Sequence, residues 1–142
     1  MIVLDTNVVS ELMRDRPDER VVTWADAMPS GRLYLTSVTT AELLYGVEKM
    51  ALGARRAALG AAVADLIMVE FDGRVLPFDV QSSPAYARLV ADRERRGHPI
   101  GMADAMIAAI ALAAGADMLA TRNTKDFEGV GLDVIDPWGT RT

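Results

Sequence analysis

Short apolar runs alternate with segments of helical periodicity along this chain, and this alternation is the feature that most constrains its fold. A helix between two strands returns the chain to the same edge of a sheet, so the alternation predicts an α/β fold with parallel strands covered on both faces. The predicted strands are residues 2–4, 33–36, 75–78, 118–121 and 134–135. The predicted helices are residues 8–13, 18–28, 51–69, 80–96 and 102–114, with a further helix after residues 37–40 that carries Glu42 in its first turn.

Length and composition narrow the possibilities further. The chain has 142 residues, 51% of them hydrophobic, and no linker divides it, so we expect one domain over residues 1–142. It contains no cysteine and a single histidine, His98, which excludes disulfides, thiolate zinc sites and His-rich metal sites. Any bound metal must therefore be held by oxygen. No export signal follows Met1 and no apolar run is long enough to span a membrane, so we expect a cytoplasmic protein.

Two carboxylates are predicted where strands give way to helices. Asp5 directly follows the first predicted strand, at the sheet edge where open α/β proteins bind their ligands. An Asp at this position also caps helices, so both roles are open. Glu42 ends the sequence TTAE of residues 39–42, which matches a capping box, and its role is open in the same way.

Asp104 is the only charged residue between Ile100 and Ala116. It is expected in the first turn of the most buried helix. Burying a carboxylate without a partner costs several kcal/mol, whereas a position at a helix start recovers only about 1 kcal/mol. A bound cation would offset the remainder, so we interpret Asp104 as a functional residue.

If the fold brings Asp5, Glu42 and Asp104 together, their mutual repulsion favours binding of a hard divalent cation, Mg²⁺ or, in its place, Mn²⁺. Such an ion activates a water molecule for attack on a phosphodiester without a His or Lys base. The sequence therefore indicates metal-dependent phosphodiester cleavage. The net charge of −5 opposes binding to nucleic acid, although a bound cation would cancel part of it.

Polar residues that follow the fourth predicted strand reach the same sheet edge. Asn123 and Asp126 are candidate metal ligands there, with an ordinary turn as the alternative, and Thr121 supplies a hydroxyl. Thr6 and Asn7 are candidates to hydrogen-bond the waters of a metal ion, and local helix capping is the alternative that we favour for both.

Arg14 and Arg122 are the candidate RNA-binding cations. A second group of basic residues in the predicted helix 80–96 alternates with acids, and we interpret it as a solvated helix face rather than an RNA-binding groove. Its members are Arg88, Arg93, Arg95 and Arg96. For Trp24 and Trp138, core or interface packing and stacking on bases are both open.

Four separated blocks of this sequence occur in the order typical of a known family. They are IVLDTN at residues 2–7, TAEL at 40–43, DAMIAA at 104–109, and a block at 121–138 that begins with TRN and ends with PW. On these blocks the chain resembles, over essentially its whole length, the PIN-domain ribonuclease toxins of the VapC type, close to the FitB branch. The resemblance implies a three-layer α/β/α sandwich with a central parallel sheet of about five strands.

The resemblance also implies a function: Mg²⁺-dependent endoribonuclease, and toxin of a type II toxin-antitoxin system. Such toxins form homodimers and are inhibited by a VapB/FitA-type antitoxin, which alone contacts DNA. Asp5, Glu42 and Asp104 match the family's acidic positions. Asn123 occupies the place of a fourth acid, which departs from the four-acid pattern, and Asp126 is a candidate replacement. Without a fourth acid, a one-metal mechanism is favoured, with Asn123 as a neutral ligand.

Two alternatives remain open on the sequence. A receiver-like or phosphotransfer α/β protein also gathers acids and Mg²⁺ at the carboxyl edge of a parallel sheet, but its acids follow strands, whereas Glu42 and Asp104 are predicted at helix starts. A non-catalytic module that keeps the fold only to bind a partner protein is the second alternative. The three acids disfavour it.

Overall fold

Five parallel strands form the centre of the molecule. The structure is a computed structural model that describes residues 1–29 and 31–139. The strands are β1 (Ile2–Leu4), β2 (Leu33–Thr36), β3 (Val75–Leu76), β4 (Met118–Ala120) and β5 (Asp133–Ile135). They lie in the order β3-β2-β1-β4-β5. The parallel five-stranded sheet predicted from the sequence is therefore confirmed.

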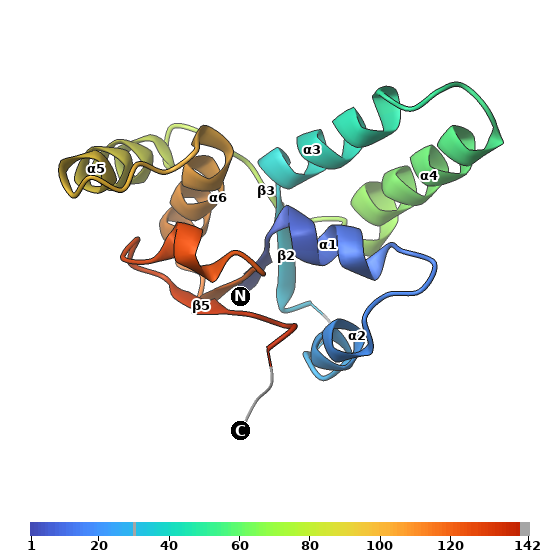
Figure 1. The fold of residues 1–142 in the computed structure, drawn as a ribbon, viewed down its shortest axis with the longest axis horizontal. Coiled ribbons are helices and arrows are strands. Elements are labelled where there is room, and N and C mark those ends of the chain that lie inside the picture. The colour runs from blue at the N-terminus through green and yellow to red at the C-terminus, as the bar shows by residue number, and fades with distance from the viewer. Residues whose placement is uncertain (30, 140–142) are drawn as a thin grey trace.

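In the part of the chain that the structure describes, six α-helices and two short helical turns connect these strands (Figure 1). They are α1 (Thr6–Leu12), α2 (Glu19–Asp26), α3 (Ser37–Glu48), α4 (Ala54–Asp65), the π-helical turn η1 (Leu66–Glu70), α5 (Ser83–Arg95), α6 (Met102–Ala113) and the 3₁₀ turn η2 (Thr124–Phe127). Among the described residues, no helix is both long and apolar enough to cross a membrane.

The strand residues divide between two hydrophobic cores, because successive side chains of a strand point to opposite faces of the sheet. Ile2 and Leu4 pack into one core together with apolar residues of α1, α2 and η1. Val3 packs into the other core, against the small and apolar residues of α5 and α6. The sheet is thus covered on both faces, as a three-layer α/β/α sandwich requires, and α6 is almost wholly buried from Ala105 to Ala111.

The order in which the chain adds strands to the sheet reverses between β1 and β4. From β1 the chain moves outward through β2 to β3, and it then returns to place β4 and β5 on the other side of β1. Leu4 pairs with Ala120, so Asp5 and Thr121 each follow directly after this pair. Open α/β proteins bind their ligands at such a switch point.

Several predicted helix starts were wrong: α1 begins at Thr6 rather than residue 8, α4 begins at Ala54 rather than residue 51, and α3 and α5 were also misplaced. Helix α3 begins at Ser37, because the Thr36 hydroxyl caps it at the backbone N–H of Thr39 directly after β2. Glu42 is therefore in the second turn of α3, not the first, and it is not part of a capping box. Helix α5 begins at Ser83 rather than near residue 80, because Asp79 caps a turn before it at the N–H groups of residues 81 and 82.

Candidate functional site

Asp5 ties the central strand to its neighbour and to α1. Its side chain caps α1 by accepting a hydrogen bond from the backbone N–H of Thr6 at 2.8 Å. The other carboxylate oxygen accepts from the Thr121 hydroxyl at 2.7 Å and from Asn7 Nδ2 at 3.4 Å. Only 5% of Asp5 is exposed, and burial raises the pKa of its carboxyl despite these hydrogen bonds. The sequence left open whether Asp5 caps a helix or belongs to a functional site. The structure shows that it can do both, because Asp5 caps α1 and also lines a pocket at the edge of the sheet.

Thr6 links α1 to Glu42 on α3. The Thr6 hydroxyl donates to Glu42 Oε1 at 2.6 Å and lies 3.0 Å from the Thr39 hydroxyl, which is itself buried. Glu42 is exposed, so this hydrogen bond orients a side chain that would otherwise be free to turn in solvent. Thr6 is therefore the first residue of α1 and also makes a long-range contact with Glu42 on α3.

Asp104 is in the first turn of α6, as predicted, and is partly buried. Within the described residues it accepts no hydrogen bond and forms no salt bridge. Burial, followed by the charges of Asp5, Asp126 and Glu42, raises the pKa of its carboxyl to about 6. A carboxylate that is destabilised by both burial and like charges is a group that a cation would stabilise.

The three acids line one open pocket of about 550 Å³, which we call the carboxylate pocket. Its lining residues are Asp5, Thr6, Asn7, Ser10, Glu11, Arg14, Glu42, Asp104, Arg122, Asn123 and Trp138. Most of the site residues proposed from the sequence therefore lie in this pocket. Asp126, on the exposed face of η2, does not line the pocket, although its charge raises the pKa of both Asp5 and Asp104.

The oxygen-rich lining fits a hard divalent cation. Within residues 1–29 and 31–139, no three acidic or histidine side chains are close enough to bind one ion directly as they stand. Mg²⁺ retains several waters in proteins, so acids around a pocket can hold it partly through water. Asp5, Asp104 and Glu42 are the residues that would hold the ion.

The Thr121 hydroxyl is shared between three elements. Besides donating to Asp5, it accepts hydrogen bonds from the backbone N–H of Asn123 at 3.0 Å and from Asn7 Nδ2 at 3.4 Å. Asn7 also accepts from the backbone N–H of Arg122 at 3.2 Å. Thr121 and Asn7 thus fix the loop after β4 against α1, rather than capping locally.

Three residues of this region have roles that sequence reasoning missed or left open. Glu11 is 8% exposed, lines the pocket and accepts from the backbone N–H of Asp18 at 2.9 Å. Its position in an amphipathic segment gave no sign of this. Trp138 packs in the core at 6% exposure and supports Arg122, whose guanidinium lies 5.0 Å from the ring centre. Arg93 was predicted to lie on a solvated helix face. That prediction was wrong, because Arg93 is buried, with 7% of its surface exposed.

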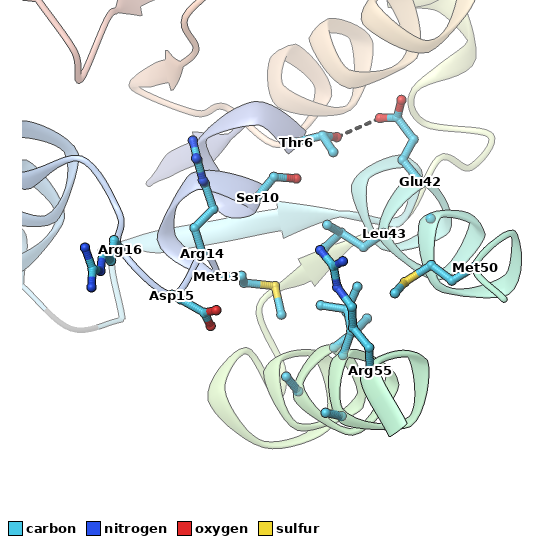
Figure 2. Close-up of a pocket in the computed structure, with 15 residues that line it drawn as sticks. Thr6, Ser10, Met13, Arg14, Asp15, Arg16, Glu42, Leu43, Met50 and Arg55 are labelled. Atoms are coloured by element: carbon cyan, nitrogen blue, oxygen red, sulfur yellow. Dashed lines mark hydrogen bonds between the residues drawn. The ribbon is translucent and has the colours of Figure 1, made fainter. Parts of the chain in front are cut away.

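A larger groove of about 1140 Å³ runs from the carboxylate pocket between α1, α3 and α4 (Figure 2). Thr6, Ser10, Arg14 and Glu42 line both, so the two spaces are continuous. Figure 2 shows the Thr6–Glu42 hydrogen bond in this groove, and both residues also line the carboxylate pocket. The groove provides room next to the acids for an extended polymer.

Known proteins resemble this chain over nearly its whole length. A VapC ribonuclease, Y4jK, from Sinorhizobium fredii is 47% identical over 97% of this chain and 98% of its own length. Toxin FitB of Neisseria gonorrhoeae is 38% identical over 97% of this chain and 99% of its own. Among solved structures, that of FitAB bound to an IR36 DNA fragment matches with a TM-score of 0.93 at 37% identity, over 100% of this chain and 99% of that chain.

The comparison with protein families agrees with these relatives. The PIN domain family matches residues 2–131, a range that includes Asp5, Glu42 and Asp104 and every strand up to β4. A structural match of this quality at 37% identity shows that the fold is shared. The chain therefore belongs to the PIN-domain family.

Proposed function

We propose that this protein is a metal-dependent endoribonuclease and the toxin of a type II toxin-antitoxin pair, and that its whole chain acts as one PIN domain. The observation that carries the proposal is Asp104, a partly buried carboxylate without a partner among the described residues, in a pocket that Asp5 and Glu42 also line. Relatives named VapC ribonuclease and toxin FitB support the reaction and the biological role.

We propose Mg²⁺ as the ion, with Mn²⁺ as a substitute. When bound, the ion activates water and offsets charge that develops at the phosphate. Asp5, Glu42 and Asp104 hold it, while the hydroxyls of Thr121 and Thr6 keep Asp5 and Glu42 in place. Support for this choice is that the metal-binding groups in the pocket lining are carboxylate, hydroxyl and amide oxygens, and that the sequence has no cysteine.

We assign RNA binding to the two arginines that line the carboxylate pocket. Arg122 is exposed and held over Trp138, and Arg14 is exposed at the boundary between the pocket and the larger groove. Both can bind phosphates on either side of the cleaved bond. Their local positive charge counters the acids, which reconciles RNA binding with a net charge of −5.

The partner that we propose is a VapB/FitA-type antitoxin whose tail enters the carboxylate pocket. A solved relative is a FitAB complex bound to DNA, which supports a pair that reaches DNA through the antitoxin. We also propose a homodimer. We propose that the protein acts in the cytoplasm, where it would meet both RNA and a promoter-bound antitoxin, and that it needs no membrane.

Membership of the PIN-domain family removes the receiver-like alternative. The non-catalytic alternative is decided by incubating a mixed cellular RNA pool with the purified chain and Mg²⁺ or Mn²⁺. Discrete products are expected, and they should disappear with EDTA and in Asp5→Ala. Tight binding of the ion without cleavage of any RNA in the pool would instead favour a module that only binds a partner.

A further inference from the structure

Arg93, near the end of α5, is a buried cation whose partners are all backbone carbonyls. Within the described residues it pairs with no carboxylate. Its Nε donates to the carbonyl of His98 at 2.7 Å, and its Nη1 donates to the carbonyls of Asp126 at 2.9 Å and Glu128 at 3.3 Å. Neighbouring Arg95, in contrast, is exposed.

These carbonyls belong to two segments that each lead to an acid of the site. His98 lies in the connection between α5 and α6, six residues before Asp104. Asp126 and Glu128 belong to η2 and the residue after it, in the loop that follows β4. One guanidinium therefore fixes the start of α6 relative to the turn that carries the Asp126 carboxylate.

An arginine is suited to this task because its planar guanidinium presents five N–H donors in a fixed fork. Burying a charge without a counter-ion is costly, so a purely structural link between two loops is more easily made by neutral side chains. A rigid arginine link is advantageous when the two loops carry charged residues whose separation must be fixed. Asp126 and Asp104 are such a pair, because the charge of Asp126 is one of those that raise the pKa of the Asp104 carboxyl.

We propose that Arg93 is a positioning residue of the metal site, which holds Asp126 at the distance from Asp104 that lets Asp126 act in place of the missing fourth acid. The inference rests on the metal-dependent function proposed above. Asp126 acts from just outside the carboxylate pocket, through water or through its charge. Arg93 itself touches neither the ion nor the RNA.

The test measures binding of Mn²⁺ to the RNA-free protein by isothermal titration calorimetry. Arg93→Gln keeps one donor group and loses the fork and the charge, and we expect about tenfold weaker binding, in the range found for residues that orient metal ligands. Arg93→Lys should lie between Gln and the unaltered protein. Arg95→Gln on the same helix is the matched control and should bind normally.

Loss of stability alone must not mimic this result. Val21→Ala, a change in the other core, serves as a destabilised control that leaves both loops untouched, and circular dichroism confirms that each variant is folded. If Arg93→Gln does not fold, Arg93→Lys carries the comparison. Normal Mn²⁺ affinity in a folded Arg93 variant, or an equal loss in Val21→Ala, would overturn the inference.

A double variant separates positioning from a general effect. In an Asp126→Asn background the charge that Arg93 positions is gone, so Arg93→Lys should weaken Mn²⁺ binding no further. Additive losses would show that Arg93 does not act through Asp126 and would overturn the inference while leaving the nuclease intact. Failure of the unaltered protein to bind Mn²⁺ at all would instead remove the proposed metal site and this inference together.

Discussion

The Thr121 hydroxyl donates a 2.7 Å hydrogen bond to Asp5 and so joins the carboxyl ends of the two neighbouring central strands, β1 and β4. Both residues are buried. The site acid on one strand is therefore oriented by a neutral side chain on the next, at the place where the direction of the chain across the sheet reverses. The cleavage chemistry proposed here depends on this contact, which makes it the first to test.

Thr121→Val removes the hydroxyl while keeping the shape of the side chain. Asp5 then loses a hydrogen bond that favours its charged form, so the free energy of unfolding should fall by about 1–3 kcal/mol and Mn²⁺ binding should weaken. Urea denaturation and calorimetry measure the two effects. Thr121→Ser, which keeps the hydroxyl, should retain most of the Mn²⁺ affinity, and equal losses in both variants would count against the hydrogen bond.

Asp104→Asn removes a charge without changing the size of the side chain. We expect RNA cleavage to disappear, because the group that most needs a cation is gone, while the fold is kept. Cleavage of the same RNA pool and the circular dichroism spectrum check the two halves of this prediction. Full activity, or an unfolded variant, would contradict the assignment of Asp104.

The stability of the metal-free protein should depend on pH through Asp104. Its pKa is about 6 in the folded protein, against 3.8 ordinarily, so the folded state binds more protons and stability falls as pH rises from about 4 to about 6. Asp104 is only partly buried, so solvent screening reduces the effect to on the order of 1 kcal/mol. Thermal unfolding in EDTA should show the decline in the unaltered protein and a smaller one in Asp104→Asn. Identical pH profiles would contradict the raised pKa.

Thr6→Val releases Glu42 from its 2.6 Å hydrogen bond. The exposed Glu42 side chain then has more conformations to lose when it binds the ion, and we expect Mn²⁺ affinity to fall by about tenfold. Thr40→Val is the matched control, because the Thr40 hydroxyl donates only to the Ser37 carbonyl within α3. An equal effect of the two substitutions would show that Thr6 does not act through Glu42.

Arg122→Gln should weaken RNA binding in a way that depends on salt. Losing one phosphate contact lowers the slope of log affinity against log salt by about 1. Fluorescence anisotropy on a fluorescently labelled RNA, with the Asp104→Asn protein to prevent cleavage, measures this slope. Arg32→Gln is the control, since Arg32 pairs with Asp117 away from the carboxylate pocket. An unchanged slope would exclude a phosphate contact by Arg122.

Much of the fold could be predicted because its signals are local. The apolar runs at β1 and β4 identified the central strands, and the single charge in an apolar helix identified Asp104 as unusual. The first turn of α3 was misplaced because Thr36 is both the last residue of β2 and the cap of α3, with no loop between the strand and the helix.

The environment of Arg93 could not be predicted, for a different physical reason. Its partners are carbonyls of residues 98, 126 and 128, and every residue has a carbonyl, so the sequence carries no mark of which ones it meets. A row of alternating charges on a helix is usually solvated. What distinguishes Arg93 from its exposed neighbours is its burial and its hydrogen bonds to carbonyls of two other segments.

The strand order has a consequence for the timing of synthesis. Because β4 is among the last strands of the chain yet pairs with β1, a growing chain has all the residues of β1 and α3 long before it can close its sheet. Until Thr121 has left the ribosome, Asp5 lacks its hydroxyl partner and β1 has an unpaired edge. The hydrogen bond that orients Asp5 therefore forms only after β4 has been synthesised and has paired with β1, so the site around this acid is completed late in folding.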